Sequence, residues 1–330
     1  MKLTYLWLLV SAVLLGACSN SMNQVQMSNY PQSTVGLTIS NTQNSFFKAF
    51  YEAYEVEVKN QPSVTAFLNN ANDNQDVQNQ QIEEMISQGA KALVINLADV
   101  NQGGAIIGKY CNQVALVFFN RNPGDKALAK CQNAYFVDGD ATQAGVLQGL
   151  KVLELWKENP DWDKNKDGKI QFAMLEGLVG HAGAQARTKW AISTMESYPE
   201  LGIPVESVFH EHAMFNKEIA KETVSRWALS PAFGRVEIIL ANNDAMALGA
   251  SGALSERQIN LPIFGIDATS EALDAIKADR MTATVLNDAT NQAKVALRLA
   301  SNLAADVSPL NGIDYRMEYR VIQVPYQEVQ

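Results

Sequence analysis

Positive charge is scarce in this chain and is nowhere clustered. Its 330 residues include 26 Lys and Arg against 35 Asp and Glu, which gives a formal net charge of −9. A protein that binds a phosphate backbone needs a basic patch, and no run of Lys or Arg supplies one. The sequence therefore predicts no nucleic-acid partner. A chain of 330 residues is too long to pack around one ordinary hydrophobic core, so two lobes are expected.

Long hydrophobic runs are scarce as well. The apolar run Leu3–Leu15 follows the positive Lys2 and ends in small residues before Cys18. A membrane-spanning helix takes about 20 apolar residues, so this run predicts a cleaved signal peptide, residues 1–17, rather than a span. The Leu-Gly-Ala-Cys ending resembles the lipobox of bacterial lipoproteins, which implies acylation of Cys18. The alternative is an ordinary secretory signal with an incidental Cys.

The segment that follows, residues 18–33, is rich in Asn, Gln and Ser and is expected to be a flexible, lipid-anchored linker. Several acyl chains would anchor the protein firmly, since each buried CH₂ contributes about 0.8 kcal/mol. The expected location is therefore the periplasmic side of a bacterial membrane. Ser19 resembles the pattern retained at an outer membrane, and which membrane holds the anchor depends on the host.

Cysteine is rare, with three residues in the whole chain. Cys111 and Cys131 each lie a few residues before an apolar, strand-like run, Ala115–Phe119 and Ala134–Val137. If these strands are parallel neighbours, the two residues start at similar heights, and an exported compartment permits a disulfide. The sequence leaves a disulfide and two buried thiols equally open.

Short β-branched runs alternate with longer amphipathic stretches through most of the chain. Such alternation predicts an α/β fold with parallel sheets that helices cover on both faces. The expected strands are Val35–Ser40, Ala92–Leu97, Ala115–Phe119, Ala134–Val137, Ile170–Leu175, Val205–Phe209, Val236–Ala241, Leu261–Ile266, Thr282–Leu286 and Tyr319–Val324. The expected helices are Phe46–Val58, Gln75–Gln88, Thr142–Glu158, Ala184–Tyr198, Lys217–Ala228, Asp244–Glu256, Ser270–Ala278 and Asn291–Ala305.

Polar side chains follow several of these strands, at the point where each strand ends. Ligands of open parallel sheets bind outside the carboxyl ends of the strands, and Asn and Asp offer the donors and acceptors that a polyhydroxylated ligand needs. Each residue alone is better explained as a helix cap, above all Asp244, but the recurrence favours a shared site. These residues are Asn44, Asn120, Arg121, Asn242, Asn243, Asp244, Asp267, Asn287 and Asp288.

Residues for catalysis are lacking. No Gly-rich phosphate loop precedes a helix, and Gly103-Gly104 is expected to form a turn. His210 and His212 lie two apart on an expected strand, where exposed strand-end histidines are commoner than a metal pair. No activated nucleophile and no paired acid and base can be assigned, so an enzyme is not expected.

The sharpest local motif is Asp163-Lys164-Asn165-Lys166-Asp167-Gly168. It matches the first half of a calcium-binding loop, in which oxygen side chains at alternate positions turn inward and the Gly permits a tight bend. The carbonyl of Lys169 and the side chain of Gln171 can add ligands, but Met174 stands where an EF-hand places its bidentate Glu. The loop therefore predicts a structural Ca²⁺ site that a distant residue completes. The alternative is an acidic turn without metal.

Together these residues resemble one family, the periplasmic galactose- and glucose-binding proteins of bacterial ABC importers. The resemblance covers essentially the whole mature chain and implies the type I periplasmic-binding fold, with two doubly wound parallel-sheet lobes joined by three hinge crossings. It implies an N-terminal lobe of residues 34–139 plus 289–321 and a C-terminal lobe of residues 140–288 plus 322–330. The matching segments are Val117–Asn120, Asp163–Phe172, Gly180-His181, Ala186-Arg187, Ala241–Met246, Leu286–Asp288 and Asn291–Ala293.

The resemblance also implies the residues of two sites. Glu237 corresponds to the distant Glu that completes the family's calcium loop, and Phe46 to one of two rings that sandwich the apolar C–H faces of a pyranose. The implied metal ligands are Asp163, Asn165, Asp167, Lys169, Gln171 and Glu237. The implied sugar contacts are Asn44, Phe46, Asn120, Arg121, His181, Arg187, Phe215, Asn243, Asp267 and Asn287.

The chain departs from the family pattern at four of its cleft positions. Asn44 and Gly183 replace Asp residues that bind sugar hydroxyls. Phe215 replaces a Trp ring, and Arg121 replaces a Lys. Losing two carboxylates predicts a more positive cleft and weaker binding of free galactose or glucose, because a charged hydrogen bond contributes about 1.5–3 kcal/mol. The hypothesis is a ligand that differs at C1, as a glycoside or an anionic sugar derivative that fills the space at Gly183.

The expected function is that of a monomeric solute-binding protein of an ABC importer. Ligand binding favours the closed form, which the importer's permease and ATPase complex recognises. The alternative is a sensory module on the same fold, which presents its closed form to a chemoreceptor or sensor kinase.

Overall fold

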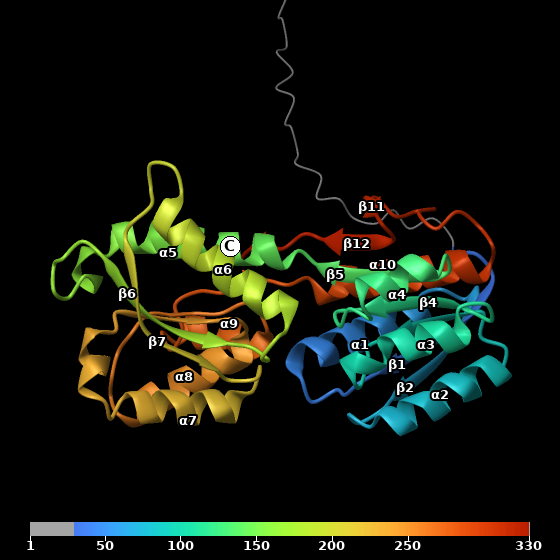
Figure 1. Cartoon of the computed structure of the whole chain (residues 1–330), viewed down its shortest axis with the longest axis horizontal. Helices are drawn as coiled ribbons and strands as arrows, with labels where there is room; N and C mark the ends of the chain where they lie inside the picture. Colours follow the sequence, from blue (N-terminus) through green and yellow to red (C-terminus); the bar gives the residue numbers. More distant parts are fainter. Residues whose placement is uncertain (1–29, 330) are drawn as a thin grey trace, which may run out of the picture.

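Two lobes lie side by side in the computed structural model, which describes residues 30–329 (Figure 1). The expected signal peptide 1–17 and the expected lipidation site Cys18 lie outside the described residues. No helix of the described part is long and apolar enough to cross a membrane. The expected α/β fold with parallel sheets is confirmed.

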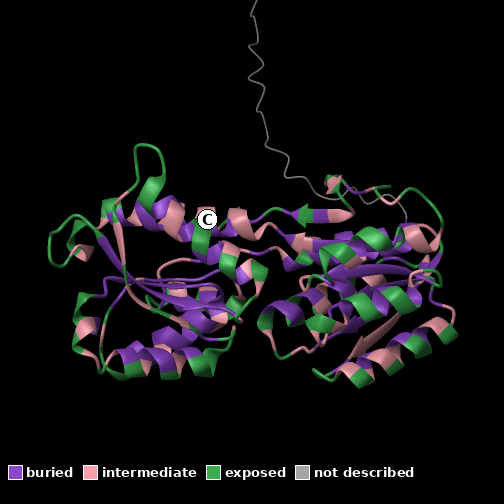
Figure 2. Ribbon diagram, viewed as in Figure 1, coloured by how far each residue is buried: buried purple, intermediate pink, exposed green. Residues whose placement is uncertain are grey.

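The N-terminal lobe is built on a seven-stranded sheet with the order β11-β12-β5-β4-β3-β1-β2, parallel except for β11 against β12. Helices cover both faces and the strands between them are largely buried (Figure 2), so alternate residues of β4 enter different cores. Val117 and Phe119 pack with α1 and α10, whereas Leu116 and Phe118 pack with α2, α3 and α4. The strands are β1 (Ser33–Ile39), β2 (Val64–Asn70), β3 (Ala92–Ile95), β4 (Ala115–Phe119), β5 (Ala134–Gly139), β11 (Met317–Glu318) and β12 (Val321–Val324), and the helices are α1 (Ser45–Lys59), α2 (Gln75–Ser87), α3 (Gly103–Tyr110), α4 (Asp125–Lys130) and α10 (Ala289–Ala304), with a 3-10 turn at Val100–Gln102.

The C-terminal lobe is built on a four-stranded parallel sheet with the order β7-β6-β8-β9. Its central strand β6 is buried throughout, with Phe172 and Met174 packed under α5 and α6, and Ala173 and Leu175 under α7 and α8. The strands are β6 (Ile170–Glu176), β7 (Val205–His212), β8 (Ile238–Ala241) and β9 (Ile263–Phe264), and the helices are α5 (Ala141–Glu158), α6 (Ala182–Ser197), α7 (Lys217–Trp227), α8 (Asp244–Glu256) and α9 (Ser270–Lys277), with 3-10 turns at Pro160–Trp162 and Pro231–Arg235.

The chain passes between the lobes after β5, after β10 (Val285–Leu286) and after β12. The last of these crossings lies later than expected. β12 pairs with β5 as far as Val324, opposite Gly139, so the expected start of the final C-terminal segment at residue 322 is wrong. Pro325 follows, and it has no N–H to continue the ladder. The chain then forms β13 (Gln327–Glu328), which pairs antiparallel with β10.

The end of the expected linker 18–33 is already part of the N-terminal lobe. The guanidinium carbon of Arg298 lies 3.5 Å from the ring centroid of Tyr30, whose hydroxyl donates to Glu57 at 3.1 Å. Arg298 and Tyr30 are both buried, so the aromatic ring stacks on a guanidinium charge inside the lobe. Ser33 begins β1. The sequence did not reveal this anchoring, because the partners of Tyr30 lie far along the chain.

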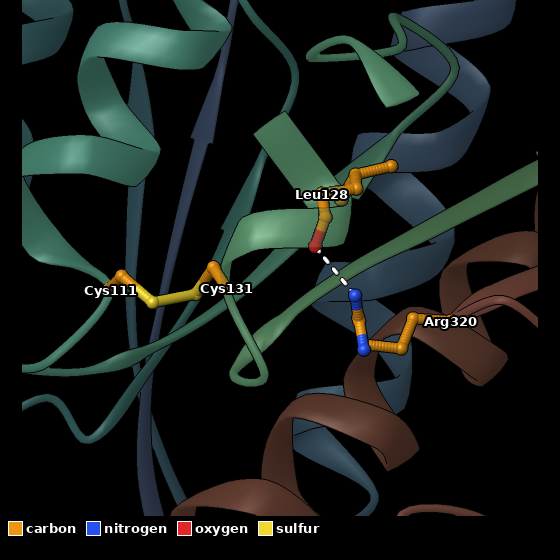
Figure 3. Close-up of a disulfide and its surroundings, with 4 residues drawn as sticks. All are labelled: Cys111, Leu128, Cys131 and Arg320. Carbon is orange, nitrogen blue, oxygen red and sulfur yellow. Dashed lines mark hydrogen bonds between the residues drawn. A yellow bond between two sulfur atoms is a disulfide. The ribbon is translucent and has the colours of Figure 1, made fainter. Parts of the chain in front are cut away.

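Cys111 and Cys131 form a disulfide with their Cα atoms 5.9 Å apart, which decides the alternative that the sequence left open (Figure 3). The strands that follow them, β4 and β5, are indeed parallel neighbours. The bridge joins the C-terminal ends of α3 and α4. Arg320 gives α4 a second tie, since its Nη2 donates to the carbonyl of Leu128 at 2.7 Å.

The periodicity of the sequence did not reveal β2, α3, α4, β11 or β13. β2 is an edge strand that is largely half-buried and ends in two Asn, so it lacks an apolar run. The expected turn at Gly103-Gly104 is also wrong, because these residues begin α3. A Cβ on Gly103 would lie 2.4 Å from Cα of Pro123, so the glycine allows the helix to pack closely on that loop.

Candidate ligand-binding cleft

A cavity of about 520 Å³ lies between the two lobes. Its walls come from the carboxyl ends of strands in both sheets, where ligands of parallel sheets bind. All the expected sugar contacts line it. They are Asn44, Phe46, Asn120 and Arg121 from the N-terminal lobe, and His181, Arg187, Phe215, Asn243, Asp267 and Asn287 from the C-terminal lobe.

Aromatic rings reach the cavity from both lobes. Phe46 stands in the first turn of α1, and Phe215 in the loop between β7 and α7. The Phe215 ring packs edge-on against His181, with ring centroids 5.3 Å apart. It also lies over Gly177, where a Cβ would come 2.2 Å from the ring. Gly177 therefore makes room for Phe215 and sets the position of the ring in the cleft wall.

Arg187 reaches the cavity from α6 and is held from behind. Its Nη1 donates to the carbonyl of Asn242 at 2.8 Å, and its Nη2 donates to the hydroxyl of Tyr326 at 2.5 Å. Its Nε is buried and has no partner among the described residues. Arg187 is only 8% exposed, and its two hydrogen bonds fix the guanidinium in the cleft wall.

The lining contains one buried carboxylate-amide pair. Asp267 Oδ1 accepts a hydrogen bond from Nδ2 of Asn287 at 3.0 Å, and Oδ1 of Asn287 accepts one from Nε2 of Gln292 at 2.7 Å. Burial raises the pKa of Asp267, while the nearby guanidinium of Arg187 and the amide of Asn287 lower it. Asn287 supports Asp267 with one N–H and keeps a second, and the other carboxylate oxygen of Asp267 remains to accept from a ligand.

His181 caps α6, because its Nδ1 accepts the backbone N–H of Ala184 at 3.2 Å. Burial, followed by the charges of Arg187 and Arg121, lowers the pKa of His181 to about 4. The ring is therefore neutral at physiological pH, with its proton on Nε2. It presents a hydrogen-bond donor to the cavity.

Asn120 and Arg121 follow β4 on the opposite wall. Asn120 adopts a left-handed backbone conformation with φ of 59°, which turns the chain at the end of the strand. Arg121 Nη1 donates to the carbonyls of Leu97 and Ala98 at 2.6 and 3.1 Å, and its guanidinium carbon lies 5.2 Å from the ring centroid of Phe47. Arg121 is thus fixed by neighbours and keeps its charge at the cleft.

Asp244 does not cap α8, contrary to expectation. Asn243 is the N-cap, and its Oδ1 accepts from the N–H of Met246 at 3.0 Å. Asp244 is fully buried and instead accepts from the N–H of Thr269 at 2.7 Å and from the hydroxyl of Thr284 at 2.6 Å. Burial, together with the charge of Asp267, raises the pKa of Asp244 to about 7. Its role is to brace the segment that carries Asp267.

Further lining residues carried no recognisable signal in the sequence, because ordinary loop residues and helix starts supply them. Asn41 and Asp73 bind each other at 2.8 Å near the mouth, and Lys217 pairs there with Glu271. The lining residues that the sequence did not single out are Asn41, Gln43, Ser45, Phe47, Asp73, Leu178, Met214, Asn216, Lys217, Glu218, Ala245, Leu248, Thr269 and Glu271.

The expected calcium loop lies at the far end of the C-terminal lobe, before β6. The structure brings the distant Glu237 to it: Oε1 accepts the N–H of Lys164 at 2.8 Å, and Oε2 accepts the N–H of Gln171 at 2.9 Å. The loop folds on its own oxygens, since Asp163 accepts the N–H groups of Asp167 and Gly168 at 3.1 and 2.9 Å. Glu237 thus contacts the backbone of the loop that carries the other expected ligands.

The loop suits a hard cation in its chemistry. Gln171 Nε2 donates to Asp167 at 2.8 Å, and its buried Oε1 has no partner among the described residues. An orphaned amide oxygen beside two Asp and one Glu is a donor set that Ca²⁺ prefers. In the described part of the chain, no group of three or more His, Cys, Asp or Glu side chains is arranged to hold a metal ion.

The two histidines of β7 are engaged by neighbours. His210 binds Glu176 at 2.6 Å, and His212 binds the carbonyl of Gly177 at 3.0 Å.

Comparison with known proteins identifies the family to which this chain belongs. A family model described as a periplasmic binding protein domain matches residues 35–306. The chain belongs to the periplasmic binding protein family. The D-galactose/methyl-galactoside binding periplasmic protein MglB of Haemophilus influenzae is 38% identical over 293 residues, which cover 88% of each chain. The ribose import binding protein RbsB of Bacillus subtilis is 24% identical over 305 residues, 91% of each chain.

Solved structures of periplasmic binding proteins share the fold. An ABC transporter solute binding protein of Bacillus halodurans with bound myo-inositol matches with a TM-score of 0.73 and 24% identity, covering 91% of this chain and 95% of that chain. A periplasmic solute binding protein of Actinobacillus succinogenes with bound D-allose matches with a TM-score of 0.74 and 19% identity, covering 90% and 97%. The family consists of binding proteins, which confirms that this chain is not an enzyme.

Proposed function

We propose that this periplasmic binding protein captures a monosaccharide, of the galactose or glucose type or a C1-modified derivative, and delivers it to an ABC importer. The observation that carries the proposal is the cavity itself. Residues of both lobes meet there with rings from either side and with polar groups around them. A pyranose has apolar faces and a polar rim, and this lining matches both.

The related H. influenzae protein is described as binding D-galactose and methyl-galactoside, which supports a hexose or its glycoside. The ligand would bind the closed arrangement of the lobes more tightly than an open one, and so shift the population toward the form that the permease recognises. A chemoreceptor is the alternative partner for the same closed form. Uptake of the ligand after deletion of this protein's own gene separates the two roles, because loss of a purely sensory protein leaves uptake intact.

Calorimetric titration tests the binding proposal. Galactose, glucose and their methyl glycosides are titrated into freshly purified protein, after native mass spectrometry has weighed any co-purified ligand. Asp267→Asn should weaken binding of the preferred sugar by roughly ten- to hundredfold, because a charged hydrogen bond is lost. Asp274→Asn, an exposed position on α9, is the matched control. The proposal fails if no monosaccharide or derivative binds.

We also propose a lipid anchor at Cys18 and a structural Ca²⁺ ion in the loop before β6. In the second site Asp163, Asn165, Asp167, the carbonyl of Lys169, Gln171 and Glu237 would hold the metal. The ion would neutralise the carboxylates of Asp163, Asp167 and Glu237 and fix the loop on β6 and β8. For the anchor, Cys18→Ala should release the protein from the membrane fraction and remove the acyl mass from the N-terminal peptide.

A further inference from the structure

The cleft is unusually rich in hydrogen-bond donors, because several helices start at it. α1, α6, α7, α8 and α9 all begin at the cavity, and each has an N-cap residue that lines it. Each cap uses its acceptor atom on backbone N–H groups of its own helix. The caps are Asn44, His181, Asn216, Asn243 and Thr269.

Capping decides which half of each side chain is left for a ligand. Asn44 Oδ1 accepts from the N–H groups of Phe46 and Phe47 at 3.0 and 3.2 Å, and Asn243 Oδ1 accepts from Met246 at 3.0 Å. The part of each amide that remains is the NH₂ group, a donor. His181 likewise accepts through Nδ1 and is left with Nε2–H.

Cations outnumber anions among the lining charges that are not exposed. Arg187 and Arg121 each contribute a guanidinium, and the carboxylate of Asp267, which interacts with Arg187, offsets part of this charge. The N-terminal ends of five helices add partial positive charge. Of the acidic residues in the lining, Asp267 is buried, whereas Asp73, Glu218 and Glu271 are exposed near the mouth.

A free hexose fits this set poorly. Each of its hydroxyls can accept from the lining, but each also carries a proton that needs an acceptor once the cleft closes. In the described lining, the buried carboxylate of Asp267 and the amide oxygen of Asn120 are the main side-chain acceptors. A hydroxyl proton left without an acceptor in a closed cavity loses its hydrogen bond to water, which weakens binding.

We infer that the cleft selects a hexose derivative that bears an anionic group, a carboxylate or a phosphate. Such a group accepts several hydrogen bonds and donates none, so it can accept from more than one of the cap amides at once. Its charge faces Arg187 and Arg121. This inference rests on the proposed function and narrows it, because it chooses an anionic derivative over the neutral sugar and its glycoside.

Calorimetry with matched ligands tests the inference. Galactose, methyl β-galactoside, galacturonate and galactose 6-phosphate, with the corresponding glucose series, are titrated into the purified protein. At least one anionic sugar should bind roughly tenfold or more tightly than its neutral parent, and its affinity should fall as salt is raised. The galacturonate and phosphate arms identify which anion is bound. Equal or tighter binding of the neutral sugar overturns the inference but leaves the proposed function standing, whereas binding of none overturns both.

A single substitution should shift the preference from the anionic sugar toward the neutral one. In Asn44→Asp the new carboxylate still caps α1 with one oxygen and offers the other as an acceptor. Affinity for the anionic sugar should fall by roughly tenfold, and affinity for galactose should stay or rise. The matched control is Asn74→Asp, since Asn74 caps α2 in the same way, at 2.9 Å to Asp76 N, outside the cavity lining. The inference is contradicted if Asn74→Asp changes the affinities as Asn44→Asp does. It is also contradicted if Asn44→Asp weakens the binding of galactose as much as that of the anionic sugar.

Discussion

Nη2 of Arg187 lies 2.5 Å from the hydroxyl oxygen of Tyr326, although 139 positions separate the two residues in the chain. Arg187 lines the cleft from α6, and Tyr326 follows the third crossing between the lobes. The Tyr326 ring also fills the space over Gly139 at the first crossing, where a Cβ would lie 2.4 Å away. One side chain therefore touches two crossings and a cleft arginine, so closure of the lobes and placement of Arg187 depend on the same contact.

Tyr326→Phe tests this contact. The ring remains but the hydroxyl acceptor of Arg187 is lost, so we expect ligand affinity to fall by about 1–3 kcal/mol. Calorimetric titration measures the affinity, and thermal unfolding without ligand reports any general loss of stability. Tyr51→Phe on α1, away from the cavity, is the control. Unchanged affinity in Tyr326→Phe contradicts a positioning role.

The disulfide should stabilise the N-terminal lobe. Cys111 and Cys131 are separated by 20 positions, and the loop they close contains β4 and the cleft residues Asn120 and Arg121. For a loop of this length the chain-entropy model gives about 3 kcal/mol. The free energy of unfolding of the double variant Cys111→Ala/Cys131→Ala should be lower by that amount, and its denaturant midpoint should fall accordingly. Adding reductant should bring the wild type to the same midpoint and leave the variant unmoved.

Calcium should stabilise the C-terminal lobe if the loop before β6 holds it. At a free concentration of 100 times its dissociation constant, a ligand that binds only the folded state adds about 2.7 kcal/mol. We therefore expect Ca²⁺ to raise the melting temperature of chelator-treated protein, and Glu237→Gln to reduce that increase strongly. Glu52→Gln, an exposed position on α1, should respond as the wild type does. An equal response to Ca²⁺ in Glu237→Gln rules out this loop as the site.

The titration of His181 should make the stability of the protein depend on pH. Its folded-state pKa is lowered to about 4 by burial and by the charges of Arg187 and Arg121, below the value of 6.5 for a free ring. Between these values the unfolded chain takes up the proton and the folded protein does not. The stability that the neutral ring contributes is therefore complete above pH 6.5 and is lost as the pH falls toward 4.

His181→Asn isolates this effect, because Asn also caps a helix but does not titrate. Urea unfolding of both proteins at several pH values gives the difference in free energy of unfolding. The wild type should lose stability relative to the variant as the pH is lowered from about 6.5 to about 4. Profiles that stay parallel across this interval would show that the ring is protonated in the folded state.

Much of the fold could be read from local patterns. The fully buried strands β3 and β4 are continuous apolar runs because both faces of a parallel sheet are covered, and the long helices carry apolar residues at helical spacing. The cleft residues could be anticipated from their places after strand ends. The edge strand β2 could not, because most of its side chains are only half-buried and its place in the sheet is set by pairing with β1.

The sequence by itself determined two α/β lobes, polar strand ends and an acidic loop, because these depend on local periodicity and side-chain chemistry. Only the tertiary structure decided which partners those residues have. It joined Cys111 to Cys131, brought Glu237 to the loop, removed Asp244 from its expected cap and placed Tyr326 behind Arg187. It also turned the acceptors of the cap residues toward their helices. Each of these contacts depends on how distant segments pack, and no local pattern contains that information.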